Sequence, residues 1–142
     1  MDLTVVFEPY AGEAENQFVI NSLDNHNIAV TGLSAYYPIA FFLKAESGEV
    51  MGGLLGQIWG GWLHVTYLWV AEPARGKGNA TRLMNAAEKY AVERGCGGAF
   101  LETFSFQARP FYEKLGYRLF GVLEDYPPGH SQFFLKKRLA AA

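Results

Sequence analysis

Apolar and polar residues change their spacing several times along this chain, and each change marks an expected element. Short runs rich in β-branched and aromatic residues, bounded by glycine, proline or polar clusters, predict strands. Such runs occupy residues 3–7, 39–45, 49–59, 62–70, 98–104, 117–123 and 132–137. Residues 27–38 have no regular period, so the pattern predicts a loop there that can include a short helix.

Three other segments have the spacing of helices. Between residues 80 and 94 apolar residues recur mostly three or four positions apart, and Gly95 follows as a stop signal. Residues 11–25 carry acidic residues near their start, where the helix dipole favours negative charge. Residues 107–115 predict a shorter helix that ends at Gly116.

The order of these elements predicts the fold class. A helix between the strands at 62–70 and 98–104 implies that these two strands are parallel. The Gly60-Gly61 turn instead joins antiparallel neighbours. The expected fold is therefore α+β, with a mixed, mostly antiparallel sheet of six to seven strands, a central parallel pair and flanking helices. We expect residues 1–142 to form one domain.

Composition narrows the functional classes. The chain has 142 residues, half of them apolar, which is enough for a sizeable core. A net charge of −2 with 18% charged residues argues against a general nucleic-acid binder. The single cysteine, Cys96, excludes an internal disulfide and a multi-cysteine metal site, so we expect no metal. Neither a leader nor a membrane-length apolar run is present, which favours the cytoplasm and no membrane partner.

A glycine-rich turn follows the strand at 62–70 and has the sequence Arg75-Gly76-Lys77-Gly78-Asn79-Ala80. The first amides of a helix have no internal partner, and glycine lets an anion approach them closely. A Walker loop would need Ser or Thr after Gly76-Lys77, where Gly78 stands. A dinucleotide fingerprint would need a third glycine, where Thr81 stands. An anion-binding loop and a purely geometric turn remain.

Two motifs together resemble the GNAT superfamily of N-acetyltransferases. The pattern Arg75-x-x-Gly78-x-Ala80 is similar to the family's acyl-CoA pyrophosphate loop, Q/R-x-x-G-x-G/A. Residues 108–117, ARPFYEKLGY, resemble the family's second signature and follow a further strand, as in the family. The resemblance covers roughly residues 38–139 and implies the GNAT acyl-CoA N-acyltransferase fold. It also implies that the central parallel strands splay apart and hold the pantetheine arm of acetyl-CoA, the expected cosubstrate.

The resemblance implies a set of cosubstrate-binding residues. Pyrophosphate is expected on the amides of the glycine turn, and the thioester on the backbone of the central strand. The implied residues are Leu68, Trp69, Val70, Arg75, Gly76, Lys77, Gly78, Asn79, Ala80 and Thr81. Since strand side chains alternate, Trp69 is expected to point away from the side of its two neighbours.

The resemblance also implies the catalytic groups. Tyr112 matches the family's general-acid tyrosine. A free phenol has a pKa near ~10 and a thiol near ~8.5, so donation to the thiolate is uphill by roughly 2 kcal/mol. For the general base, Glu102 ranks first and His64 second, although lone strand histidines are often structural. The asparagine that the family often carries before the tyrosine is absent, which puts cofactor contacts from that helix in doubt.

These features lead to an N-acetyltransferase that moves an acetyl group to a primary amine of a small acceptor by direct attack in a ternary complex. A catalytically silent acyl-CoA-binding sensor or interaction module is the alternative. A nucleotide-binding module is a remote third reading. The sequence allows a homodimer but fixes neither the oligomeric state, the acceptor nor the length of the acyl group.

Overall fold

The computed structural model describes residues 1–34 and 36–139, and the chain divides into two units, residues 1–35 and 36–142. The first unit contains helix α1 (Glu13–Thr31), none of whose residues is buried. Gly32 ends the helix in the left-handed conformation (φ 72°) and donates its N–H to Ile28 O at 2.8 Å. No helix among the described residues is long and apolar enough to cross a membrane.

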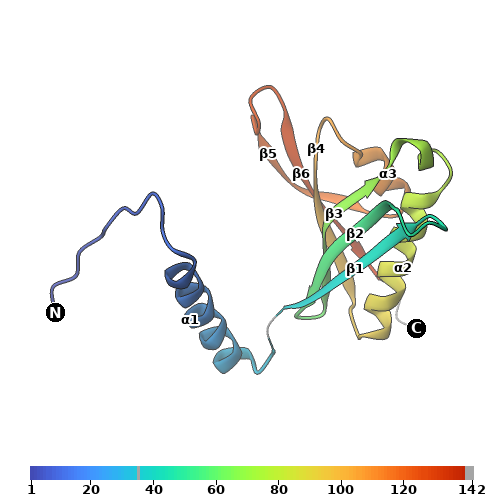
Figure 1. Cartoon of the computed structure of the whole chain (residues 1–142). Coiled ribbons are helices and arrows are strands. Elements are labelled where there is room, and N and C mark those ends of the chain that lie inside the picture. Colours follow the sequence, from blue (N-terminus) through green and yellow to red (C-terminus); the bar gives the residue numbers. More distant parts are fainter. Residues whose placement is uncertain (35, 140–142) are drawn as a thin grey trace. The chain divides into compact units, whose positions relative to one another are not determined.

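The second unit is built on a six-stranded sheet with the order β1-β2-β3-β4-β6-β5 (Figure 1). All neighbours are antiparallel except β3 and β4, which are parallel. The strands are β1 (Tyr37–Lys44), β2 (Val50–Trp59), β3 (Trp62–Val70), β4 (Gly98–Phe104), β5 (Arg118–Glu124) and β6 (Ser131–Arg138). The predicted α+β fold with a central parallel pair is confirmed.

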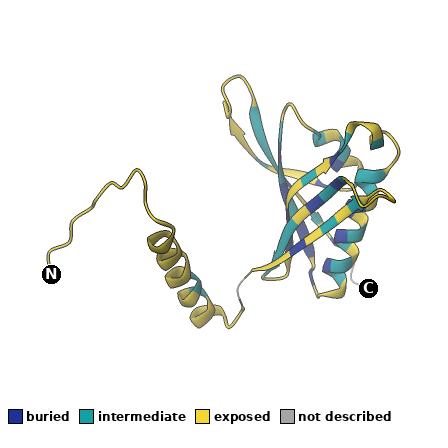
Figure 2. Cartoon of the chain, in the orientation of Figure 1, coloured by how far each residue is buried: buried dark blue, intermediate teal, exposed yellow. Residues whose placement is uncertain are grey.

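Two helices cover one face of this sheet and enclose the core. Helix α2 (Asn79–Glu93) connects β3 to β4, and the short α3 (Arg109–Lys114) follows β4 (Figure 1). The buried residues concentrate between these helices and the central strands (Figure 2). They include Leu83, Met84, Ala87 and Ala91 from α2 and Leu54, Leu63, Val65, Ala99, Leu101 and Leu135 from the sheet. The period of three or four residues seen in the sequence is thus the buried stripe of α2.

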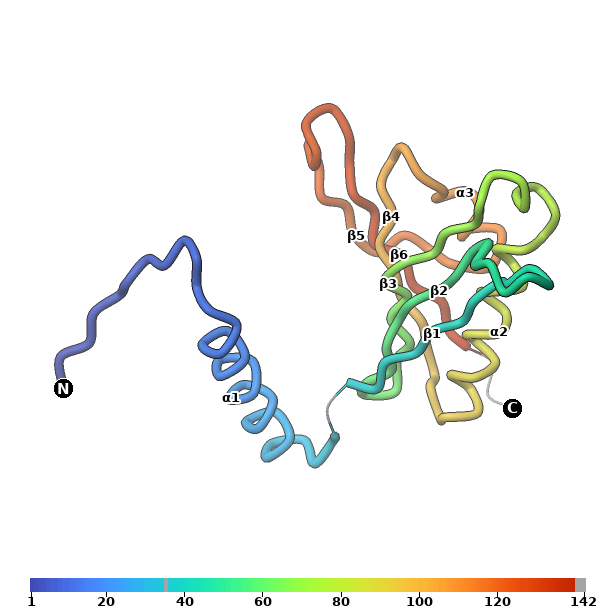
Figure 3. Tube along the Cα trace, in the orientation of Figure 1, coloured from blue at the N-terminus to red at the C-terminus, as the bar shows by residue number. Residues whose placement is uncertain are grey.

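The central parallel strands stay paired over only part of their length. Their register runs from Trp62 opposite Gly98 to Val65 opposite Leu101 and ends there. Beyond that point the Cα traces of β3 and β4 diverge (Figure 3). The edge of β3 that faces β4 therefore lacks a strand partner over its second half.

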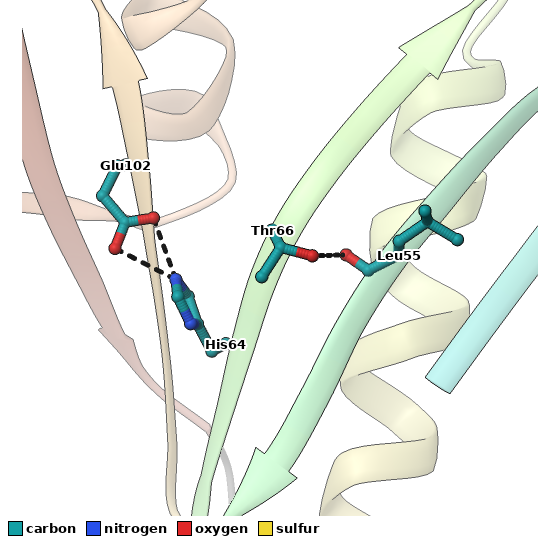
Figure 4. Close-up of polar contacts among 4 residues, drawn as sticks. All are labelled: Leu55, His64, Thr66 and Glu102. Atoms are coloured by element: carbon teal, nitrogen blue, oxygen red, sulfur yellow. Dashed lines mark hydrogen bonds and ion pairs between the residues drawn. The ribbon is translucent and has the colours of Figure 1, made fainter. Parts of the chain in front are cut away.

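A β-bulge at Thr66 changes the side-chain phase of β3. Leu55 of β2 lies opposite Tyr67, and the next residue, Gly56, lies opposite Val65, so Thr66 is an extra residue. The Thr66 hydroxyl donates to Leu55 O at 3.0 Å (Figure 4). After the bulge Val70 is buried, whereas Trp69 is 55% exposed on the opposite side, as the alternation predicted.

Two predictions for the first third of the chain are wrong. Residues 3–7 form no strand and pair with no other described strand, because an apolar alternation does not by itself supply a neighbour. Helix α1 continues to Thr31, well into the segment predicted as a loop. The Thr31 hydroxyl donates to Asn27 O at 2.7 Å within this last turn. Ala35, which belongs to the same predicted loop, lies outside the described residues.

Candidate active site

The glycine turn presents a row of free backbone donors at the start of α2. Gly78 is the N-cap residue with φ 80°, a conformation that favours glycine. Among residues 1–34 and 36–139, no group accepts a hydrogen bond from the amides of residues 76 to 81. These amides lie beside a cavity of about 340 Å³, which is lined by Val70, Ala74, Arg75, Gly76, Gly78, Asn79, Ala80, Thr81 and Phe111. No carboxylate lines this cavity, so the residues present fit a diphosphate.

Three polar side chains fix the shape of this turn. Arg75 Nε donates to Val70 O at 2.8 Å, which ties the turn to the end of β3. Asn79 Nδ2 donates to Ala74 O at 2.9 Å, and Arg82 Nη1 donates to Asn79 Oδ1 at 3.0 Å. These side chains hold the turn in shape through other groups, and the backbone N–H groups of the turn remain available to a ligand.

A second cavity, of about 350 Å³, fills the gap between the diverging strands. Its walls are Val65, Thr66, Tyr67 and Leu68 of β3, Leu101, Glu102, Thr103 and Phe104 of β4, and Gln107, Ala108, Tyr112 and Gln132. The N–H of Ala71 points to β2, where it donates to Met51 O at 2.7 Å. Since successive residues of a strand point their N–H groups to opposite edges, Leu68 directs its N–H into the gap.

Tyr112 closes this gap from α3. The residue is 8% exposed, and its ring packs edge-on against Phe111 and Tyr117, with ring centroids 5.1 and 6.1 Å away. Its hydroxyl makes no hydrogen bond to any described residue, yet no fully enclosed side-chain polar atom in that part of the chain lacks a partner. The hydroxyl therefore reaches the cavity. Burial raises the pKa of Tyr112 to about 12, so the phenol is protonated throughout the physiological range.

His64, in the paired part of β3, meets Glu102, which follows the last paired residue of β4 (Figure 4). His64 Nε2 lies 2.9 Å from Glu102 Oε2 and 3.0 Å from Oε1. Because a carboxylate only accepts hydrogen bonds, Nε2–H is the donor of this contact. The imidazole also stacks on Phe100, with centroids 4.2 Å apart and planes 10° from parallel. Both side chains are about three-quarters covered. The two candidate bases thus form one hydrogen-bonded pair rather than two separate sites.

Comparison with known proteins assigns the family of this site. A model of the acetyltransferase (GNAT) family matches residues 6–117, which is more than half of the chain. The chain belongs to the GNAT acetyltransferase family. It is an N-acetyltransferase, and acetyl-CoA, the acetyl donor of GNAT enzymes, is its cosubstrate.

Individual GNAT relatives are similar over most of the chain. Blasticidin-S acetyltransferase of Streptomyces morookaense is 46% identical over 101 residues, which cover 70% of this chain and 74% of that protein. Acetyltransferase Atu2258 of Agrobacterium fabrum is 32% identical over 136 residues and covers 96% and 99% of the two chains. A crystal structure of an acetyltransferase from Bacillus cereus ATCC 14579 has a TM-score of 0.84 at 35% identity, covering 94% and 98%.

The structure distributes the predicted cosubstrate residues of this GNAT enzyme over three locations. Most line the cavity at the glycine turn, while Leu68 lines the gap between the strands. Lys77 and Trp69 line neither cavity, and both are exposed. For all ten residues the assignment to cosubstrate binding stays a prediction.

Other residues of these walls were not singled out from the sequence. Phe111 lines the cavity at the turn, and its place in the second GNAT motif, directly before Tyr112, was the available signal. Gln107 also lines the gap, where its Oε1 accepts the Phe104 N–H at 2.8 Å. No local pattern marks Thr66 as a bulge, because its unpaired position depends on the register with β2.

Proposed function

We propose that the protein transfers the acetyl group of acetyl-CoA to a primary amine of a small molecule by direct attack in a ternary complex. The observation that carries this proposal is the shared wall of the strand gap. Leu68, Glu102 and Tyr112 line one cavity of about 350 Å³. That cavity therefore offers an N–H donor, a carboxylate and a phenol to the reacting groups.

The turn at the start of α2 holds the diphosphate in this proposal. The amides of residues 76 to 81 supply aligned donors, and the dipole of the fifteen-residue helix adds positive potential. Acetyl-CoA supplies an activated acyl group on a thiolate leaving group. The Leu68 N–H stabilises negative charge that develops on the acyl oxygen.

Glu102 accepts the proton of the attacking amine, because it is the member of the pair that lines the gap. His64 orients this carboxylate through the hydrogen bonds of 2.9 and 3.0 Å. Glu102 therefore keeps its first rank as general base, and His64 acts through it as a positioning residue.

Tyr112 stabilises the departing sulfur mainly as a hydrogen-bond donor. A phenol with a pKa of about 12 is a weaker acid than a thiol near ~8.5, so full transfer is uphill by about 5 kcal/mol. This is more than the free side chains suggest, because burial raises the phenol pKa. Proton donation must accordingly be coupled to cleavage of the carbon–sulfur bond.

Two arguments support a small acceptor. The similar blasticidin-S acetyltransferase is named for a small-molecule antibiotic. In addition, the strand gap has a limited volume, about 350 Å³, part of which the thioester would occupy. We further propose that residues 1–142 act as one domain in the cytoplasm, without a nucleic-acid or membrane partner and with a homodimer allowed.

Thiol release from acetyl-CoA across a panel of small amines, with blasticidin S as the first member, tests this function. Wild type should turn over at least one amine. Tyr112→Phe should lower kcat by about 10²-fold with the acetyl-CoA KM within about threefold, because the phenol acts on the departing sulfur and not in binding.

Normal CoA binding without turnover of any amine would favour the silent acyl-CoA-binding module instead. An unchanged kcat in Tyr112→Phe would remove the phenol from the mechanism. Turnover only with a protein substrate would contradict the small acceptor.

A further inference from the structure

A cavity of about 380 Å³ lies at the end of the sheet opposite the glycine turn. It is lined by Gly61, Trp62, Gly97, Arg118, Lys136, Lys137 and Arg138. Four of these seven residues are cationic and none is acidic, in a chain whose net charge is −2. The positive charge is therefore concentrated locally in a concave site.

Three of the four cations have no carboxylate partner. Lys137 Nζ pairs with Glu88 Oε1 at 2.6 Å, whereas Arg118, Lys136 and Arg138 form no ion pair with any residue in the described part of the chain. Arg118 and Lys136 also stand directly opposite each other in the register of β5 and β6. Like charges in that position destabilise a sheet, so a bound anion would reduce the repulsion between Arg118 and Lys136.

An aromatic ring forms the neutral wall of this cavity. Gly98 lies opposite Arg138 in the sheet, and a Cβ at position 98 would come within 2.5 Å of the Trp62 ring. The absence of a side chain at Gly98 lets the indole lie across β4, next to β6, the strand that carries three of the four cations. The indole remains 41% exposed.

We propose that this cavity binds a small phosphorylated molecule, separately from the acetyl-CoA site. Arg118, Arg138 and Lys136 line it without a carboxylate partner, and the Lys136 ammonium lies 5.4 Å from the centroid of the Phe120 ring. Guanidinium groups bind phosphate oxygens in a bidentate manner. An exposed indole edge beside them suits the non-phosphate part of such a ligand. A concave site of this volume favours a small molecule over a nucleic-acid strand, which needs an extended basic track. The proposal does not depend on the acceptor amine.

Titration of the full-length, 15N-labelled protein with inorganic pyrophosphate tests this site. Saturation with CoA beforehand occupies the glycine turn, and constant ionic strength removes general screening. The Trp62 indole N–H signal, assigned with Trp62→Phe, should shift in a saturable manner while that of Trp69 stays fixed. In Arg118→Gln/Arg138→Gln the dissociation constant should rise by about tenfold or more.

The matched control is Lys44→Gln/Lys89→Gln, which removes the same charge from exposed positions outside the cavity and should bind pyrophosphate as wild type does. Equal weakening in both double variants, or no saturable shift in the wild type, would overturn the proposal. Binding of a short oligonucleotide at this signal without binding of pyrophosphate would assign the cavity to nucleic acid and equally overturn it.

Discussion

Tyr112 combines a deeply packed ring with a hydroxyl that has no partner among the described residues. Burial favours the neutral phenol, and the free hydroxyl is left to donate to a ligand in the gap. Packing and proposed reactivity therefore have the same origin at this residue.

The raised pKa of Tyr112 makes a stability prediction. In the unfolded chain the phenol ionises near ~10, whereas in the folded protein it stays neutral up to about 12. As pH rises through this window the unfolded state loses a proton that the folded state keeps, so stability falls. The free energy of unfolding of wild type, minus that of Tyr112→Phe, should decrease by about 1.3 kcal/mol between pH 9 and 11. Urea unfolding at the two pH values measures it, and a constant difference would contradict the raised pKa.

Glu102→Gln should impair catalysis in a pH-dependent way. The amide cannot accept the amine proton, so kcat/KM should fall by about 10²-fold near neutral pH. The loss should shrink at alkaline pH, where the amine arrives already neutral. His64→Gln keeps a donor for the Glu102 carboxylate and serves as the control, with a loss below about tenfold. A loss of equal size at every pH would assign Glu102 a structural role.

Individual residues were predictable where a motif fixes their place, as for Tyr112 and Gly78. The pairing of His64 with Glu102 was not, although both were named, because it depends on the parallel register that puts His64 beside Phe100. Side chains 38 positions apart acquire a relation only when two strands align.

The turn and α2 function together as one element. Gly78 and Gly95 lie at opposite ends of this helix, with φ values of 80° and 86° and open space where a Cβ would be. Alanine at either position should destabilise the fold by about 1 kcal/mol, because both require the left-handed region. Only Gly78→Ala should also raise the acetyl-CoA KM, by about tenfold, since its methyl group obstructs the approach of phosphate to the amides.

Urea unfolding and initial-rate kinetics on both variants separate these effects. A similar KM in Gly78→Ala and Gly95→Ala would show that the turn does not bind the cosubstrate.

Elements with a strong period were predicted to within about two residues, and β3 and β4 have the expected bounds. Their spacing is set by burial against α2, which the sequence records directly. The predictions of a strand at residues 3–7 and of the end of α1 were wrong because burial does not determine the sequence pattern in either segment. No residue of α1 is buried, so packing against a core does not determine the spacing of its apolar residues.

At the scale of the second unit, Glu88 connects α2 to β6 and to the segment before β5. Its carboxylate accepts from Lys137 Nζ at 2.6 Å and from the Tyr117 hydroxyl at 2.8 Å, and its side chain is only 12% exposed. Burial raises the pKa of Tyr117, and the neighbouring Glu88 charge raises it further. This three-residue cluster therefore ties α2 to the C-terminal part of the sheet.

Lys137→Met should destabilise the protein by about 3 kcal/mol, because it leaves the Glu88 carboxylate without its cation. The double variant Glu88→Leu/Lys137→Met should be more stable than Lys137→Met alone, since no uncompensated charge remains. Arg109→Gln, which breaks the exposed pair with Glu113, is the control and should cost less than about 1 kcal/mol. Urea unfolding compares the three, and a double variant that is no more stable than Lys137→Met would contradict a buried ion pair.

The extra residue at Thr66 constrains how this sheet tolerates changes in length. Because it shifts the alternation by one position, Leu68 and Val70 turn inward and Tyr67 and Trp69 turn outward. If the bulge were straightened with Thr66 retained in the ladder, two large aromatic rings would turn under the helices and two aliphatic side chains would turn into water. Loss of Thr66 itself would instead leave a regular alternation with these four side chains on their present faces. A one-residue deletion in β3 should therefore be tolerated at the bulge, whereas one that leaves the bulge in place should invert the faces of the strand on one side of it.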